Sequence, residues 1–508
     1  MKGKRGIRIP TRLLVSALLF LAQILFLFVF VYTLSKNFVT IYFVFNIIAA
    51  LLVVYILNRR DNPSYKIMWI VFILIFPIFG ISVFLLWGGE RVMPHLRKKM
   101  NKCEKHYLKY LPPDWEVREA LKKYDLAHYK QADYLAGESG YPLYDGTSTE
   151  YLAPGEVFLP KLLEELQKAE KYVFIEFFIL AEGKMWDAIH RILKEKVQNG
   201  VEVRIIFDDF GSIKRQSRDF LKKLRAEGIK ISEFNPIRPS VNAFTNNRNH
   251  RKIVVIDGKT AVTGGINIGD EYINAERPLG CWMDSAIIIK GKAVRSFLAM
   301  FCAMWEFTTK RHIAINRYIP DYSVDAEGFV LPYCDGPLSR RNPAEGIYKQ
   351  ILNSSQKYVY IATPYLIIDS SMTEVLKMAA KSGIDVRIIT PGVPDKWYVH
   401  PVTQYSYLEL LESGVKIYEY TPGFLHSKLF ISDDKIATVG TVNMDYRSFV
   451  LHFECGAWIC NNSTVLDVKQ NFLEILEKSK EISLKEWQNI SVYKKLKQTV
   501  LHLFAPFM

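Results

Sequence analysis

The chain has 508 residues, with 66 Lys and Arg against 52 Asp and Glu, which gives a formal net charge of +14 at pH 7. Its length allows roughly two to four domains, and its charge favours an anionic partner such as nucleic acid, an acidic lipid surface or a phosphorylated substrate. The six cysteines include no Cys-x-x-Cys pair and no zinc-finger spacing. This argues against a structural zinc site, and we expect reduced thiols in a protein that faces the cytosol.

Three apolar stretches follow one another at the start of the chain: Leu13–Leu34, Phe38–Leu57 and Ile67–Trp87. Each is about twenty residues long, which is enough to cross the roughly 30 Å hydrocarbon core of a bilayer. A cleaved signal peptide is the alternative for the first stretch, but its apolar run is too long for one and a second stretch follows at once. We therefore predict that residues 1–90 form a membrane anchor with two or three hydrophobic segments.

The positive charges around these stretches predict their orientation, because Lys and Arg favour the cytoplasmic side. Basic residues precede the first stretch and follow the second, and only Lys36 lies between the two. The basic residues after Trp87 also favour the inside, which conflicts with a third full crossing. Pro77 and Gly80 interrupt the third stretch, so a re-entrant or interfacial hairpin would resolve the conflict; three full spans are the alternative. The prediction is a multi-pass protein of the cell membrane whose body faces the cytoplasm.

A basic stretch, residues 91–135, follows the anchor and is interpreted as a linker. Its lysines and arginines are well placed to lie against anionic headgroups, where each charge contributes roughly 1 kcal/mol. A linker that is only solvated is the alternative, because basic runs are common in solvent.

From Lys130 onward, short β-rich runs alternate with helical patterns. Tyr172–Ile179 and Gly200–Phe207 are expected to be buried strands, and the helical patterns Lys161–Lys171 and Met185–Lys196 lie on either side of the first of them. The order strand, helix, strand indicates parallel pairing with right-handed crossovers.

The second half of the chain repeats this scheme. Lys357–Ile361 matches residues 171–175, Gly383–Ile389 matches residues 200–206, and Gly414–Tyr420 matches residues 228–234. The first copy carries extra residues, Ile237–Asn247, which we expect to form a loop over a site. The predicted fold class is therefore α/β, with two similar α/β/α halves related by a pseudo-twofold axis and preceded by an N-terminal transmembrane region.

The feature that points to a function is the pattern His-x-Lys-x₄-Asp, which occurs twice. Each copy is followed at the same offset by a glycine and an asparagine, and average residue usage makes even one such match a rare coincidence. A structural histidine at a strand end is the alternative for a single motif, but two matched copies argue against it. The residues are His250, Lys252, Asp257, Gly264 and Asn267 in the first copy and His426, Lys428, Asp433, Gly440 and Asn443 in the second.

These residue types suit displacement at a phosphodiester. Residues two apart on a strand project from the same face, so the histidine and lysine of each motif are expected to point together. Two imidazoles supply a nucleophile and an acid, the ammonium groups neutralise phosphate oxygens, and the asparagine amides add donors. Because no P-loop, His-Glu-x-x-His or aspartate-rich pattern accompanies them, we predict a mechanism without a metal or other cofactor. Since each half supplies one motif, a single site shared between the halves is expected.

The motifs resemble those of the phospholipase D superfamily, and most closely those of its bacterial cardiolipin synthase branch. The two His-x-Lys-x₄-Asp patterns are similar to the motifs of the superfamily. The membrane anchor and the segment Thr263–Tyr272 are together similar to the sequences of the synthase branch. The resemblance covers nearly the whole chain. One departure is that Thr441 keeps a hydroxyl after the motif glycine whereas Gly265 has none. Further similar phrases are Arg60–Pro63, Asn249–Ile253, Gly423–Lys428 and Gly440–Asp445.

The resemblance implies two phospholipase D-like halves, residues 136–320 and 321–508, and a covalent mechanism. One histidine would attack the phosphatidyl phosphorus to form a phosphohistidine. The other would protonate the leaving alcohol and then deprotonate the incoming hydroxyl. His250 is assigned as the nucleophile and His426 as the acid and base, although the near-symmetry also permits the reverse.

Other site residues follow from the same resemblance. Lys252, Lys428, Asn267 and Asn443 would hold the phosphate. A carboxylate that follows each histidine in the sequence would orient its ring and raise its basicity, and Asp284 and Glu454 occupy the matching places. Asp257 and Asp433 are interpreted as closing the turn after each strand.

The synthase branch implies that two phosphatidylglycerol molecules give cardiolipin and glycerol, with phosphatidylglycerol and anionic membrane lipids as partners and no nucleic acid. A phospholipase D or a phosphatidylserine synthase of the same fold is the nearest alternative, because only the acceptor hydroxyl differs. A membrane-tethered nuclease is disfavoured, since a soluble substrate gives no reason for an anchor. A non-catalytic lipid-binding scaffold is disfavoured because both His/Lys pairs are intact. The residues do not indicate the oligomeric state.

Two further features leave alternatives open. Apolar residues recur at helical spacing among lysines in Ser483–Met508, which predicts an amphipathic helix that lies either on the membrane or against the second half. Tyr365, Trp397 and Tyr398 either line the entrance for a lipid or belong to the core.

Overall fold

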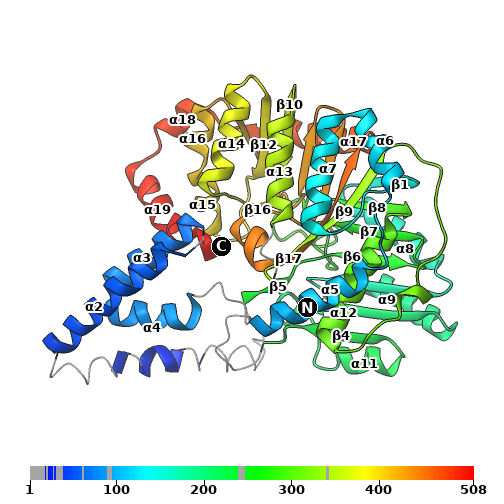
Figure 1. Cartoon of the computed structure of the whole chain (residues 1–508), viewed down its shortest axis with the longest axis horizontal. Helices are drawn as coiled ribbons and strands as arrows, with labels where there is room; N and C mark the ends of the chain where they lie inside the picture. The colour runs from blue at the N-terminus through cyan, green and yellow to red at the C-terminus, as the bar shows by residue number, and fades with distance from the viewer. Residues whose placement is uncertain are drawn as a thin grey trace, which may run out of the picture.

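The computed structural model describes residues 38–59, 62–88, 94–237, 246–338 and 342–507, with a few helical residues between 18 and 29. The body contains two large sheets with helices packed on their faces (Figure 1). The first sheet has the strand order β1-β8-β7-β6-β2-β3-β4. Its strands are β1 (Thr147–Leu152), β2 (Tyr172–Phe177), β3 (Glu202–Asp208), β4 (Lys230–Phe234), β6 (Ile253–Ile256), β7 (Thr260–Gly264) and β8 (Ala286–Gly291).

The second sheet repeats this order as β9-β17-β15-β14-β10-β12-β13 and adds β18 at its edge beside β13. Within it, β10 pairs parallel with β12 and β12 with β13, as β2 pairs with β3 and β3 with β4 in the first sheet. The α/β fold and the duplication predicted from the sequence are therefore confirmed. Its strands are β9 (Phe329–Asp335), β10 (Tyr358–Ala362), β12 (Asp385–Pro391), β13 (Lys416–Tyr420), β14 (Leu429–Ser432), β15 (Ile436–Gly440), β17 (His452–Cys460) and β18 (Ser479–Glu481).

One short strand crosses from the first half to the second. β5 (Arg248–Asn249) immediately precedes the first motif histidine, yet it pairs parallel with β17 of the second sheet. A reciprocal parallel bridge joins Met283 of the first half to Leu425 of the second. These two contacts tie the halves together beside the motifs. A further short pair, β11 (Leu366–Ile367) with β16 (Met444–Asp445), lies within the second half.

The central strands are apolar on both faces because helices cover both sides of each sheet. In β2, Val173 and Ile175 pack with helices α8 (Gly155–Gln167) and α9 (Lys184–Gln198), whereas Phe174 faces the opposite side, as the two-residue repeat of a strand requires. Helices α13 (Pro343–Ser354), α14 (Ser370–Lys381) and α16 (Tyr407–Glu412) cover the outer face of the second sheet in the same way.

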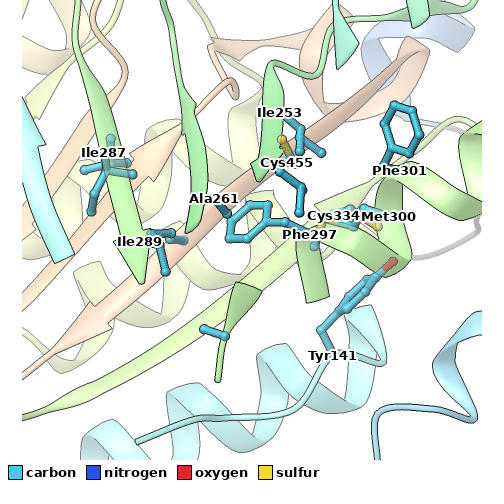
Figure 2. Packing of buried hydrophobic residues seen from close by; sticks show 14 of the residues in the cluster. Tyr141, Ile253, Ala261, Ile287, Ile289, Phe297, Met300, Phe301, Cys334 and Cys455 are labelled. Atoms are coloured by element: carbon cyan, nitrogen blue, oxygen red, sulfur yellow. The ribbon is translucent and has the colours of Figure 1, made fainter. Parts of the chain in front are cut away.

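The inner faces of the two sheets share one core. Helix α12 (Val294–Thr309), with Phe297 and Met300, packs there against Ile253 and Ile287 of the first sheet and Cys455 of the second (Figure 2). Helix α17 (Thr464–Glu477) contributes from the second half. Because this core belongs to both halves, their relative placement is held by continuous apolar packing.

The stretch expected to be a basic linker is largely helical and joins the body. Helix α5 (Pro94–Leu108) packs along α12, with Tyr107 buried in the shared core. Helices α6 (Trp115–Tyr124) and α7 (Leu126–Ser139) bury Leu121 and Leu135 in the core of the second half. Apolar positions at helical spacing among the basic residues account for this packing.

The anchor contains α2 (Phe38–Leu57), α3 (Pro63–Ile75) and α4 (Pro77–Trp87). Thr40–Asn58 is the one helix in the described part of the chain that is long and apolar enough to cross a membrane. The third apolar stretch is broken at Pro77 into α3 and α4, which pack against each other, and a Cβ on Gly80 would lie 2.8 Å from the Ile73 Cα. Most of Leu13–Leu34 lies outside the described residues.

The C-terminal stretch forms two helices, α18 (Leu484–Gln488) and α19 (Val492–His502), followed by a short 3₁₀ turn, Ala505–Phe507. Helix α19 packs against α15 (Val399–Tyr405). The extra residues before the first motif, Ile237–Asn247, lie mostly outside the described residues. Small helical turns complete the fold: α10 (Asp209–Ser212), α11 (Phe220–Ala226), η3 (Ile315–Arg317) and a π turn at Arg447–Leu451.

Candidate active site

Each motif histidine is held by the backbone of the other half. The N–H of His250 donates to the carbonyl of Phe453 on β17 at 2.9 Å, and the N–H of His426 donates to the carbonyl of Met283 at 2.7 Å. His250 lies just before strand β6, and His426 lies just before strand β14. The two motifs are therefore brought to the boundary between the halves, as the duplication predicts.

The orienting carboxylates are exchanged between the halves. Nδ1 of His250 lies 3.0 Å from both oxygens of Glu454, and Nδ1 of His426 lies 2.6 Å from Oδ2 of Asp284. The carboxylate that follows each histidine in the sequence thus contacts the histidine of the other half. When the carboxylate is ionised, Nδ1 carries the proton and donates it, so Nε2 keeps the lone pair that a nucleophile or base needs.

Burial sets the protonation of the imidazoles. Burial, followed by the charges of the two motif lysines, holds the pKa of His250 well below its ordinary value, and His426 behaves in the same way. The charge of His426 also acts on His250. Without a bound anion, both rings are therefore neutral near pH 7, and the charges of both motif lysines act on each of them.

The lysines are buried beside their histidines. Nζ of Lys252 donates to the His250 carbonyl at 2.7 Å, and Nζ of Lys428 donates to the His426 carbonyl. Burial, with a smaller contribution from the charge of Lys428, lowers the pKa of Lys252 to about 7, and burial lowers the pKa of Lys428 to about 8. An anion between the two ammonium groups would reverse these shifts, because it favours their charged forms.

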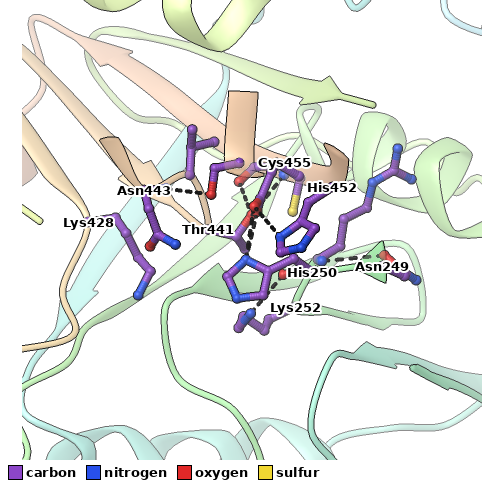
Figure 3. A network of polar contacts seen from close by, with 12 residues as sticks. Asn249, His250, Lys252, Lys428, Thr441, Asn443, His452 and Cys455 are labelled. Atoms are coloured by element: carbon purple, nitrogen blue, oxygen red, sulfur yellow. Dashed lines mark hydrogen bonds and ion pairs between the residues drawn. The ribbon is translucent and has the colours of Figure 1, made fainter. Parts of the chain in front are cut away.

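The two asparagines differ in how many hydrogen bonds their side-chain amides make within the protein. The Asn267 side chain accepts from the Ile179 N–H at 3.0 Å and donates to the Tyr272 hydroxyl at 2.7 Å. The Tyr272 ring lies 5.6 Å from that of His426. Asn443, which Figure 3 shows with the motif residues, is buried, and its Oδ1 has no hydrogen-bond partner within the described residues.

The motif aspartates close turns, as expected from the resemblance. Asp257 has a φ of 51° and accepts three backbone N–H groups, from residues 170, 171 and 172, at 2.7 to 2.8 Å. Asp433 has a φ of 55° and accepts from residues 356, 357 and 358 at 2.7 to 2.9 Å. Each carboxylate therefore ties the end of its motif strand to the start of the neighbouring strand.

The departure at Gly265 has a steric cause. Oγ1 of Thr441 donates to Glu454, whereas a Cβ at Gly265 would lie only 2.1 Å from Oδ1 of Asp284. The Asp284 carboxylate therefore occupies the space that the threonine side chain fills in the other half. Asp284 instead accepts from the Ser285 N–H at 2.8 Å, and burial raises its pKa to about 7.

Two aromatic residues beside the histidines were not found from the sequence. His452 and Trp282 stand two positions before the orienting carboxylates, and their rings lie 5.3 Å from His250 and 5.6 Å from His426. Nδ1 of His452 is 3.6 Å from Glu454, and burial lowers its pKa to about 3. Their shared offset from the carboxylates is the signal that could have identified them.

Three of these residues could together hold a metal ion. The ligand atoms of His250, His452 and Glu454 lie within 4.8 Å of one another, and imidazole with carboxylate is a suitable set for Zn²⁺. Such an ion would replace the contact between His250 and Glu454 that orients the imidazole.

Comparison with known proteins identifies the family. A family model described as "Cardiolipin synthase, PLD-like domain" matches residues 162–305 and 348–476, and one described as "Phospholipase_D-nuclease N-terminal" matches residues 44–89. The first covers both motifs, and the second covers most of α2 and all of α3 and α4.

Curated relatives match along most of their length. The chain is 41% identical to an uncharacterized protein of Streptococcus mutans over 90% of this chain and 99% of that one. It is 34% identical to cardiolipin synthase 2 of Bacillus anthracis over 90% and 89%, and 34% identical to the cardiolipin synthase of a Geobacillus species over 89% and 90%.

Among solved structures, the phosphatidylserine synthase of Haemophilus influenzae matches with a TM-score of 0.55 and 16% identity, over 70% of this chain and 92% of that one. This likeness shows a common fold. The sequence matches and the apolar helix α2 together describe a membrane-associated enzyme with two phospholipase D-like regions. The chain belongs to the cardiolipin synthase family of the phospholipase D superfamily.

Proposed function

We propose that the protein transfers a phosphatidyl group from one phosphatidylglycerol molecule to another, which yields cardiolipin and glycerol. The observation that carries the proposal is the crossed arrangement in which each half supplies a histidine and the carboxylate for the other histidine. Two oriented imidazoles with two buried ammonium groups are what a double displacement at a phosphodiester requires.

In the first step, Nε2 of His250 attacks the phosphorus of phosphatidylglycerol. A P–N bond forms, the P–O bond to the terminal glycerol breaks, and His426 gives its proton to the leaving oxygen. Lys252 and Lys428 balance the charge on the phosphate oxygens, with Asn267 and Asn443 as amide donors. His426 can carry that proton because the bound phosphodiester anion offsets the burial that keeps the empty site neutral.

In the second step, the hydroxyl of another phosphatidylglycerol attacks the phosphohistidine. His426 takes the hydroxyl proton, a P–O bond forms, and the P–N bond to His250 breaks. The histidine that serves as acid and base changes charge twice per turnover. Asp284, whose pKa burial raises to about 7, is a suitable partner for it because the two groups can share a proton. This favours His426 over His250 for that role.

We infer that the body lies on the cytoplasmic side of a multi-pass anchor and that α3 and α4 form a hairpin entering from that side. Nη1 of Arg59, just after α2, donates to the carbonyl of Gly88, just after α4, at 2.9 Å. A hairpin whose end returns to Arg59 keeps the basic residues on both sides of it at one membrane face, which is the arrangement that positive charges favour.

Incubation of the purified protein with vesicles containing phosphatidylglycerol alone tests the reaction. Cardiolipin and glycerol in equal amounts are expected, and the His250→Ala variant serves as the inactive control. Phosphatidic acid in place of cardiolipin would identify a phospholipase D, in which water is the acceptor. A phosphatidyl ester of another alcohol such as serine, formed only when that alcohol is added, would contradict the proposed acceptor.

A further inference from the structure

Helix α19 presents two faces of different character. Its inner face, with Gln498 and Leu501, packs against α15. Its outer face carries Val492, Leu496 and Val500 at four-residue intervals, so their side chains form one stripe. The inner residues fall on the opposite side of the helix by the same periodicity.

The outer stripe is apolar and exposed among the described residues. Val492 is 83% exposed, Leu496 60% and Val500 52%, and Tyr493 beside them is 77% exposed. In the neighbouring loop before α15, Trp397 is 71% exposed, and Nζ of Lys497 lies 5.6 Å from its ring centroid. We call these five residues (Val492, Tyr493, Leu496, Val500 and Trp397) the outer face. Clustered apolar side chains of this size mark an interaction surface.

The outer face is flanked by positive charge. Lys495 and Lys497 lie on either side of the stripe, by the helical periodicity. Lysine stems can lie along an apolar surface while the ammonium groups reach polar headgroups. An apolar stripe with basic flanks fits the interface of a bilayer that contains anionic lipid.

The outer face is close to the membrane anchor. Helix α3 contacts the turn Ala505–Phe507 that follows α19, and the two helices lie on the same side of the body (Figure 1). Nδ2 of Asn62, at the start of α3, donates to Oδ2 of Asp369 in the body at 2.9 Å. The anchor therefore holds this side of the body next to the bilayer.

The outer face also leads to the active site. The ring of His426 lies 5.8 Å from that of Phe424, which in turn lies 6.5 Å from that of Tyr365. Nζ of Lys396 is 5.4 Å from the Tyr365 ring centroid, and Trp397 is the next residue. Two aromatic rings and Lys396 thus connect the segment that carries the exposed tryptophan to the acid and base.

We propose that the outer face is a second membrane-binding element, which inserts into the interface of an anionic bilayer and holds the active site close to the lipid surface. The anchor tethers the body, and the outer face orients it. The role in supplying lipid rests on the proposed function, but membrane insertion itself does not. The test therefore uses a readout that involves no turnover.

An environment-sensitive fluorophore on Leu496→Cys in the full chain, reconstituted in vesicles of phosphatidylglycerol and phosphatidylcholine, tests the proposal. The matched control is Leu466→Cys on α17, a leucine that is 52% exposed on a part of the body away from α3 (Figure 1). The chain without an added cysteine corrects for labelling of the native thiols. Val500→Cys supplies a second probe on the same stripe.

Probes at positions 496 and 500 should shift to the blue and be quenched by doxyl-labelled lipid several-fold more than the probe at position 466. Quenching should weaken when phosphatidylglycerol is left out. Equal quenching at all three positions would overturn the proposal. Energy transfer between copies labelled at position 496, without quenching by lipid, would also overturn it and would identify a second copy of the chain as the occupant.

Discussion

The two halves bring the same imidazole and ammonium to the site but support them differently. His250 contacts both oxygens of a glutamate, and Thr441 donates a third hydrogen bond to that carboxylate. His426 contacts one oxygen of Asp284, and the place of the threonine is taken by a glycine. The chain trace is symmetric, whereas the hydrogen bonding around the reacting groups is not. This difference supports the proposal that one histidine is a fixed nucleophile while the other exchanges a proton.

The largest effect is expected from removing either imidazole. His250→Ala and His426→Ala should each lower kcat by at least roughly 10³-fold, because nucleophile and acid act as a unit. With phosphatidylglycerol labelled in phosphorus, acid-labile label should remain on the His426→Ala protein and be absent from His250→Ala. The opposite distribution would exchange the two roles, and substantial turnover by either variant would contradict a shared site.

The next largest effect is expected from neutralising the carboxylates. Glu454→Gln and Asp284→Asn should each lower kcat by roughly 10² to 10⁴-fold, because an amide can hold the imidazole in the wrong tautomer. If Asp284 shares the proton of His426, only Asp284→Asn should change the pH dependence of kcat. An unchanged pH profile in that variant would remove the basis for distinguishing the two histidines.

A smaller effect should follow from giving the first half the threonine that the second half has at the matching position. Gly265→Thr places a Cβ 2.1 Å from Oδ1 of Asp284, so the carboxylate has to move away from His426. Overpacking of this kind costs about 1 to 3 kcal/mol of stability, and we expect kcat to fall by more than tenfold. Thermal unfolding and kcat are measured on the same preparation, and Thr441→Ser, which keeps the hydroxyl, is the control with little change.

The smallest effect concerns pH. The lowered pKa values, about 7 for Lys252 and about 8 for Lys428, mean that the empty site loses positive charge as the pH rises through this range. The affinity for an anionic phosphodiester should fall as this positive charge is lost, so kcat/KM should decline above pH 7 to 8. The decline in kcat should occur at higher pH, because bound phosphate raises the pKa of both lysines. Coincident declines would show that the lysines do not contact the phosphate.

Much of this arrangement could be predicted from the sequence because it depends on local pattern. The repeated strand and helix periodicities predicted two similar α/β halves, and the spacing of the two motifs predicted one site between them. Asp257 and Asp433 could be interpreted as turn residues because the resemblance places each of them after a strand-like run. The apolar stretches indicated an anchor, although only α2 has the length and composition of a span within the described residues.

The tertiary structure decided which groups meet across the two halves. Spacing indicates that a carboxylate follows each histidine, but the pairing of β5 with β17 and the bridge from Met283 to Leu425 assign it to the other histidine. The shape of the packed site, and not the motif, explains why Gly265 cannot carry a side chain. Helices α5 to α7 join the core and α19 leaves an apolar stripe uncovered, although both regions have amphipathic patterns. The physical reason is that periodicity specifies which face of an element is apolar, whereas contacts between distant segments specify what covers it.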